Sequence, residues 1–168
     1  MIIAKTKRLL LREASTNDSE FILKLVNEPA WHQFISTHSI DTIEKATEYI
    51  EQKMIAMYQE HGFGLWVVEI NGEPTAIGMC GLLKRDSLQH VDLGFAFLAD
   101  FWGQGFALEA AIASLKYAKR EIKAKKVVAI TDPLNTRSVK LLGKAGFTYE
   151  SKFSHPGSDE VLSLYAKT

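Results

Sequence analysis

Hydrophobic and polar positions change their spacing several times along this chain of 168 residues. From residue 41 to 60, apolar side chains recur every three or four positions, which predicts an amphipathic helix with one buried face. The same spacing follows a capping residue at Ser15 or Thr16, until Pro29 ends or interrupts the helix. The first half of the chain is therefore expected to be largely helical.

Short apolar runs between turn residues dominate the second half and predict strands. Residues 63–70 and 75–85 flank an Asn-Gly pair, which is the strongest short signal for a β-hairpin. The other strands are expected at 8–13, 90–98, 125–131, 147–153 and 160–167, and two further helices at 103–121 and 135–145. This order, β-α-α-β-β-β-α-β-α-β-β, predicts a single α/β domain over residues 1–168 with a mixed sheet.

Composition and charge narrow the class of protein. Hydrophobic residues make up 46% and charged residues 24%, as in ordinary globular proteins, and 20 basic residues balance 20 acidic ones. The balance gives no general attraction to nucleic acid or to an anionic membrane, and no apolar run approaches the ~20 residues that span a bilayer. Cys80 has no cysteine partner, and charged residues interrupt the apolar N-terminal segment. We expect a cytoplasmic protein without nucleic acid or membrane partners.

A turn with two glycines, Gly103 and Gly105, lies between a predicted strand and a predicted helix. The first amides of a helix lack internal partners and carry the positive end of its dipole, so a phosphate is stabilised there when small residues leave room. A turn without any ligand is the alternative. A dinucleotide fingerprint is disfavoured because Leu108 occupies the place of its third glycine, and a Walker loop is excluded because no Gly-Lys-Ser/Thr follows.

Three ordered segments carry a family resemblance. The segment around the glycines reads VDLGFAFLADFWGQGFALEA and resembles the acetyl-CoA-binding motif of the GNAT N-acetyltransferases, in particular their ribosomal-protein N-terminal (RimJ/RimL-type) branch. Two other segments are similar to the same branch: TKRLLLRE near the start of the chain and DPLNTRSVKLLGKAGF at 132–147. The resemblance implies a GNAT fold with a mixed, mostly antiparallel sheet of about six to seven strands flanked by helices. It also implies acetyl-CoA as the co-substrate, with no metal.

The resemblance assigns the contacts to the cofactor residue by residue. The pantetheine arm is expected beside a splayed strand, against the backbones of Phe95 and Phe97. The glycine turn, whose amides are expected to hold the diphosphate, comprises Trp102, Gly103, Gln104, Gly105, Phe106 and Ala107. Asn135 and Ser138 match the branch's N-x-x-S pattern, which implies a contact with coenzyme A and a place near the thioester sulfur. The alternative is that Asn135 is an ordinary helix cap and Ser138 an ordinary exposed helical residue.

The implied reaction is direct attack of a neutral amine on the acetyl carbonyl, whose developing negative charge a strand amide stabilises. Asp92 matches a strand position where several GNAT enzymes have a glutamate, so we expect it to act as the base. An exposed polar strand face is the alternative. His90, two residues earlier, is expected on the same face and in contact with the acceptor.

The leaving thiolate and the acceptor complete the expected site. Many GNAT enzymes have an acidic tyrosine where this chain has Leu142, so Ser138 is assigned as a hydrogen-bond donor to the thiolate. Trp31 and Phe34 are expected at the acceptor wall, with packing in the core or in a lid as the alternative. The branch favours a protein N-terminal amine, such as that of a ribosomal protein, as the acceptor. A small-molecule amine acetyltransferase and a non-catalytic acyl-CoA-binding module stay open as alternatives. The other histidines, at 32, 38, 61 and 155, lack metal-ligand spacing.

Overall fold

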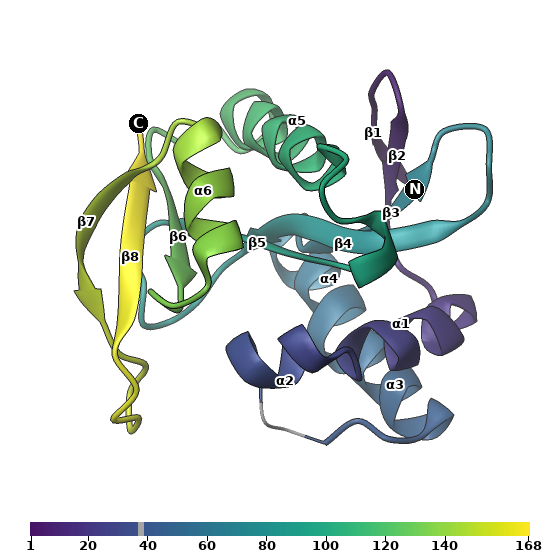
Figure 1. The fold of residues 1–168 in the computed structure, drawn as a ribbon. Coiled ribbons are helices and arrows are strands. Elements are labelled where there is room, and N and C mark those ends of the chain that lie inside the picture. The colour runs from purple at the N-terminus through teal and green to yellow at the C-terminus, as the bar shows by residue number, and fades with distance from the viewer. Residues whose placement is uncertain (37–38) are drawn as a thin grey trace.

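A sheet of eight strands forms the centre of the computed structural model, in the order β1-β2-β3-β4-β5-β6-β8-β7 (Figure 1). Its strands are β1 (Ile2–Lys5), β2 (Leu9–Arg12), β3 (Leu65–Ile70), β4 (Ala76–Leu83), β5 (Val91–Phe97), β6 (Val127–Thr131), β7 (Thr148–Phe153) and β8 (Leu162–Lys167). The structure describes residues 1–36 and 39–168. Only the β5–β6 pair is parallel among the described pairs, so the prediction of a mixed, mostly antiparallel sheet in an α/β domain is confirmed.

Two layers of helices cover the sheet (Figure 1). The helices are the 3₁₀ segments η1 (Thr16–Asp18) and η3 (Ala99–Phe101), the π-helical segment η2 (Ile50–Ile55), α1 (Ser19–Val26), α2 (Pro29–Phe34), α3 (Ile43–Tyr49), α4 (Ala56–His61), α5 (Phe106–Arg120) and α6 (Thr136–Lys144). One face carries α5 and α6, and α1 to α4 lie on the other (Figure 1). None of the helices within the described residues is long and apolar enough to cross a membrane.

The predicted elements agree with the structure except at a few places with clear physical causes. The sheet has eight strands rather than about six to seven, because the partly exposed segment β1 pairs antiparallel with β2. Ser15 caps η1 as predicted, whereas Pro29 starts the separate helix α2 at its first position, where a missing N–H costs nothing. The helix predicted from Gly103 begins only at Phe106, since the glycine turn is not helical.

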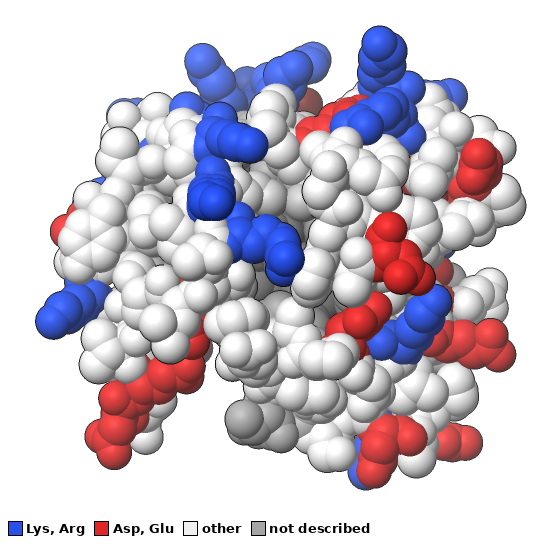
Figure 2. Space-filling model, in the orientation of Figure 1, with Lys and Arg blue, Asp and Glu red and all other residues white. Residues whose placement is uncertain are grey.

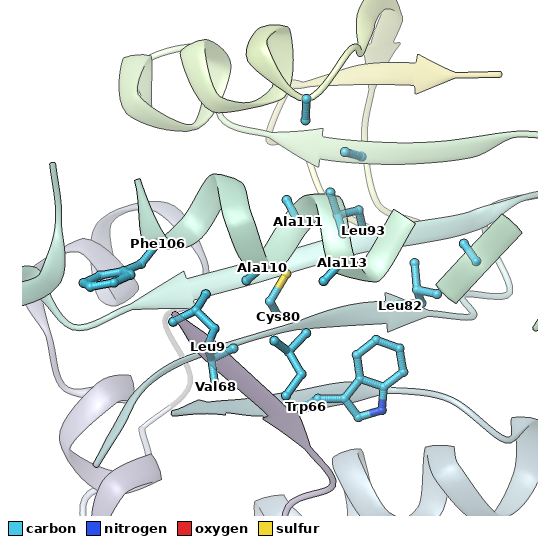
Figure 3. Packing of buried hydrophobic residues seen from close by; sticks show 14 of the residues in the cluster. Leu9, Trp66, Val68, Cys80, Leu82, Leu93, Phe106, Ala110, Ala111 and Ala113 are labelled. Atoms are coloured by element: carbon cyan, nitrogen blue, oxygen red, sulfur yellow. The ribbon is translucent and has the colours of Figure 1, made fainter. Parts of the chain in front are cut away.

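Small side chains let α5 lie close to the sheet. Ala110, Ala111 and Ala113 face the strands and are at most 7% exposed, and Figure 3 shows them close to Cys80 of β4 and Leu93 of β5. A larger residue at these helix positions would push α5 away from the sheet, because a close-packed interior has no spare volume. This packing fixes where the first turn of α5 stands relative to the end of β5.

The parallel pair β5 and β6 forms a fork. The two strands pair only at Val91–Val127 and Asp92–Val128. Beyond this point β5 continues to pair with β4 as far as Phe97, while β6 pairs with β8. The second half of β5 therefore presents one strand edge with no strand partner in the described chain (Figure 1).

Candidate active site

A cleft of about 300 Å³ opens beside the free edge of β5. Most of its lining comes from α2, the second half of β5, the turn that leads into α5 with the first turn of that helix, and α6. The predicted site residues that line it are Trp31, Phe34, Phe95, Phe97, Trp102, Gly103, Gly105, Phe106, Ala107, Asn135 and Ser138. The structure therefore brings together, in one hollow, residues that the sequence separates by more than a hundred positions (Figure 2).

The glycine turn presents unpaired amides to this cleft. Gly103 and Gly105 have φ angles of 75° and 82°, which only glycine adopts readily, and Gly105 caps α5 without a side-chain hydrogen bond. Within residues 1–36 and 39–168, no protein acceptor is hydrogen-bonded to the backbone amides from Gly103 to Ala107. These amides stand at the positive end of a helix of 15 residues. Such an arrangement binds a phosphate or diphosphate.

Cationic side chains of α6 line the cleft beside the turn. Arg137 lies over the ring of Trp102, with its guanidinium carbon 3.8 Å from the ring centroid. Lys140 and Lys144 follow on α6 and also line the cleft. Figure 2 shows a column of Lys and Arg side chains over α6, beside the hollow of this face. A bound anion would therefore meet unpaired amides on one side and positive charge on the other.

The free edge of β5 has the polarity that an added extended chain requires. The amide of Leu98 donates to the carbonyl of Ile77 of β4, and in a strand the N–H and C=O of one residue point to one edge while those of the next residue point to the other. The backbone groups of Phe95 and Phe97 therefore point away from β4, into the fork. The carbonyl of Phe97 accepts a 2.9 Å hydrogen bond from the indole Nε1 of Trp102. Phe95 and the amide of Phe97 have no strand partner on this edge among the described strands.

Asn135 and Ser138 lie at the start of α6. The side chain of Asn135 accepts a 3.3 Å hydrogen bond from the Ser138 amide, so Asn135 is the helix cap that its residue type suggests, and it also lines the cleft. Ser138 is half-buried in the cleft wall. Leu142, four residues later, is 1% exposed and belongs to the hydrophobic core. No phenol is therefore available at that position.

Asp92 is buried at the base of the fork, not on an exposed strand face. It is 2% exposed, its Oδ2 accepts a 2.7 Å hydrogen bond from Nε of Arg85, and its Oδ1 is buried without a hydrogen-bond partner among residues 1–36 and 39–168. Burial raises the pKa of this carboxyl to about 6. The charge and the hydrogen bond of Arg85 lower the pKa of Asp92, and so does the nearby backbone amide of Ile130. This amide does not reach Asp92 with the geometry of a normal hydrogen bond. Asp92 lies three residues before Phe95 and does not itself line the cleft.

Two of the other predicted residues lie outside the cleft wall. His90 precedes β5, which begins at Val91, so the alternation of the strand does not place it beside Asp92. Gln104 is in the turn, but its side chain donates to the carbonyl of Asp100. Neither His90 nor the side chain of Gln104 lines the cleft, so the structure gives no support for a direct contact of these side chains with a ligand.

Two arginines beside the site, Arg85 and Arg137, were missed by reasoning from the sequence. Arg85 lies in the irregular connection between β4 and β5, so no periodicity relates it to Asp92. Arg137 lies inside a predicted helix, and its position next to Ser138 was the only feature of the sequence that could have indicated a place near the site. Among residues 1–36 and 39–168, no group of three or more His, Cys, Asp or Glu side chains could hold a metal ion. His38 lies outside the described residues.

Comparisons with known proteins agree with this geometry. A family model described as "Acetyltransferase (GNAT) domain" matches residues 8–148. The uncharacterized protein YkkB of Bacillus subtilis is 32% identical over 91 residues, so the match spans about half of that relative, 53% of each chain. A GNAT-family acetyltransferase structure from Bacillus anthracis has a TM-score of 0.83 and 26% identity, with 99% of this chain and 98% of that chain covered. A ribosomal-protein-S5-alanine acetyltransferase from Vibrio fischeri shares the fold with a TM-score of 0.80 and 18% identity, over 99% and 96% of the chains. With most of its length matched by the family model, the chain belongs to the GNAT acetyltransferase family.

Proposed function

We propose that this protein transfers the acetyl group of acetyl-CoA to a primary amine, and that the acceptor is the N-terminal α-amine of a protein. One observation carries the proposal: the amides from Gly103 to Ala107, which have no hydrogen-bond acceptor in the described structure, stand at the start of α5, next to the edge of β5 that no described strand pairs with. The first feature suits a diphosphate and the second suits an extended amide-containing arm. Coenzyme A combines both groups in one molecule.

The residues of the cleft fit the cofactor. The amides of the glycine turn hold the diphosphate, and Arg137, Lys140 and Lys144 neutralise its charge from α6. The backbone groups of Phe95 and the amide of Phe97 bind the pantetheine arm along the fork. Acetyl-CoA supplies an acyl group activated as a thioester. A strand amide at the fork stabilises the negative charge that develops on the acetyl oxygen.

Asp92 receives the proton of the acceptor amine through water. Its buried Oδ1 has no hydrogen-bond partner in the described part of the chain, and such an oxygen is normally satisfied by an ordered water. A base with a pKa of about 6 is well matched to an α-amine with a pKa near 8, of which about one molecule in ten is neutral at pH 7. A lysine amine, with a pKa of about 10.4, would need a stronger base. Ser138 donates a hydrogen bond to the leaving thiolate.

The charges of the cleft favour a peptide over a polyamine or an aminoglycoside. Glu28 is the one acidic residue in the cleft wall described here, and it accepts a 3.3 Å hydrogen bond from the Ala99 amide. Trp31 and Phe34 on α2 make the wall opposite α6 aromatic. A multiply charged cation would meet a single carboxylate there, that of Glu28, whereas an N-terminal residue would pack on apolar surface. The activity of the Vibrio fischeri relative, named as a ribosomal-protein-S5-alanine acetyltransferase, agrees with a peptide acceptor.

Two measurements test the proposal. Isothermal titration is expected to show binding of coenzyme A, and no binding of NADH. Release of free thiol from acetyl-CoA is then followed with peptides that have free N-termini, with the same peptides blocked by acetylation, and with polyamines and aminoglycosides. Turnover with the free peptides alone supports an N-terminal acceptor. Turnover with the small amines alone overturns the acceptor, and the absence of coenzyme A binding overturns the whole proposal.

A further inference from the structure

The segment TKRLLLRE plays no part in the site described so far, yet the structure connects it to the glycine turn. Arg8, which directly precedes β2, donates from Nη1 to the carbonyl of Gln104 at 2.8 Å. Its Nε donates to Oε2 of Glu109 at 2.7 Å, and its backbone amide donates to Oε1 of the same residue at 3.0 Å. Thr6 donates to Glu109 as well, at 2.7 Å. The guanidinium carbon of Arg8 also lies 4.4 Å from the centroid of the Phe106 ring.

The bond to Gln104 determines where the next amide points. In a trans peptide unit the C=O and the N–H lie in one plane and point in opposite directions. Because the Gln104 carbonyl is held toward Arg8, the N–H of Gly105 is turned away from Arg8. Gly105 lines the cleft and Arg8 does not, so the amide is turned toward the cleft side. One hydrogen bond behind the turn thus orients a donor in front of it.

Arg8 also balances a charge at this helix start. Glu109 lies in the first turns of α5, close to where an anion would bind. Burial opposes its ionisation, but hydrogen bonds from Thr6 and Arg8 outweigh burial and hold the pKa of Glu109 below its ordinary value. The carboxylate is therefore charged at neutral pH. Its ion pair with Arg8 keeps that negative charge from repelling a diphosphate.

We infer that Arg8 is a positioning residue for the diphosphate of the cofactor, acting from behind the glycine turn through Gln104 and Glu109. This inference rests on the proposed cofactor site and extends it to a residue outside the cleft. It predicts a selective loss: removal of Arg8 weakens binding of the diphosphate part of the ligand and leaves the pantetheine part unaffected. A residue that only tied β2 to α5 would change the affinity for both parts equally, or would change stability alone.

The experiment compares two ligands and three variants by isothermal titration. The ligands are coenzyme A and pantetheine, which lacks the diphosphate and the nucleotide. Arg8→Met removes the charge and the hydrogen bonds, and Arg8→Lys keeps a charge beside Glu109 but cannot reach both partners with one planar group. The control is Arg12→Met, at the other end of β2, which removes comparable ion pairs to Asp18 and Glu69 on a surface away from the cleft. Circular dichroism and thermal unfolding establish that each variant is folded.

The expected result is a rise of about tenfold or more in the Kd of coenzyme A for Arg8→Met, as for one lost charge-assisted hydrogen bond. Arg8→Lys is expected to give a smaller rise, and the Kd of pantetheine is expected to stay within about twofold. Arg12→Met is expected to leave the preference for coenzyme A over pantetheine unchanged. Equal affinity of wild type and both Arg8 variants for coenzyme A, or a parallel loss for both ligands, would overturn the inference. A wild-type protein without any preference for coenzyme A would instead overturn the proposed cofactor site.

Discussion

Replacement of Asp92 by asparagine is expected to make the protein more stable at pH 8. The carboxyl group is 2% exposed, and its burial raises its pKa to about 6 from the ordinary value of 3.8. A buried carboxylate is costly to keep charged, whereas an amide of nearly the same shape is neutral at every pH. Arg85, the partner of Asp92, is 41% exposed and stays hydrated when the negative charge is removed. The wild-type protein is thus less stable at neutral pH because it holds this charge.

The magnitude follows from the two pKa values. A carboxyl that binds its proton more tightly when folded adds stability that is fully present below pH 3.8 and is lost as the pH rises through about 6. The difference between 3.8 and about 6 corresponds to about 3 kcal/mol of the free energy of unfolding. Asp92→Asn is therefore expected to exceed wild type by up to about 3 kcal/mol at pH 8. The two proteins are expected to be nearly equal near pH 4.

Urea unfolding of both proteins between pH 4 and pH 8 measures this difference. Other carboxyl groups cancel in the comparison, including those of Asp18 and Glu109, whose pKa values are lowered in the folded state. Asp86→Asn serves as the matched control, because Asp86 is exposed in the same connection between β4 and β5. Its effect is expected to stay within about 0.5 kcal/mol at every pH. The reasoning is refuted if Asp92→Asn is less stable than wild type at pH 8, or if the difference does not shrink as the pH falls.

The remaining predictions concern catalysis and three glycines. Asp92→Asn is expected to lower kcat/KM about 100-fold at pH 7, with a gap that narrows toward pH 9 because more of the α-amine is then neutral; a constant ratio would exclude the role of base. Gly105→Ala is expected to weaken coenzyme A binding and to lower stability by about 1 kcal/mol, since φ is 82° there. Gly143 lies inside α6 with open space around it, so Gly143→Ala is expected to raise stability by about 0.5–1 kcal/mol and to leave coenzyme A binding unchanged. Equal effects of Gly105→Ala and Gly143→Ala would contradict the role assigned to the positive φ of Gly105. Gly81→Ala is expected to prevent normal folding, measured as loss of soluble protein, because a Cβ there would lie 2.0 Å from the Gly64 carbonyl oxygen.

Local signals predicted most of the fold. Apolar spacing and the Asn-Gly turn identified the helices and the central hairpin, because both signals depend on residues that are close in the chain. The edge strand β1 was missed, since four partly exposed residues have no alternation to detect. The cleft residues of the glycine turn and of α6 were predicted through the family resemblance, and the structure gathers them in one hollow.

The two ion pairs behind the site could not be predicted, because tertiary structure alone creates them. Arg8 and Glu109 are 101 residues apart, and nothing in either segment indicates the other. Arg85 and Asp92 are only seven residues apart, but the connection between them is irregular. Burial of Asp92 depends on the layers that cover both faces of the sheet, so a pattern of alternating residues left an exposed position open as an alternative.

The fork has a mechanical consequence. Within the described sheet, strands β1 to β5 are joined to strands β6, β8 and β7 by only two ladder pairs, Val91–Val127 and Asp92–Val128. The ladder between β5 and β6 should therefore be the first strand pair of the sheet to open under heat or a pulling force, while the core that α5 and α6 share still connects the two groups of strands. A molecule bound between β5 and β6 would connect the two groups of strands, and its binding should be measurable as greater resistance of the whole sheet to opening.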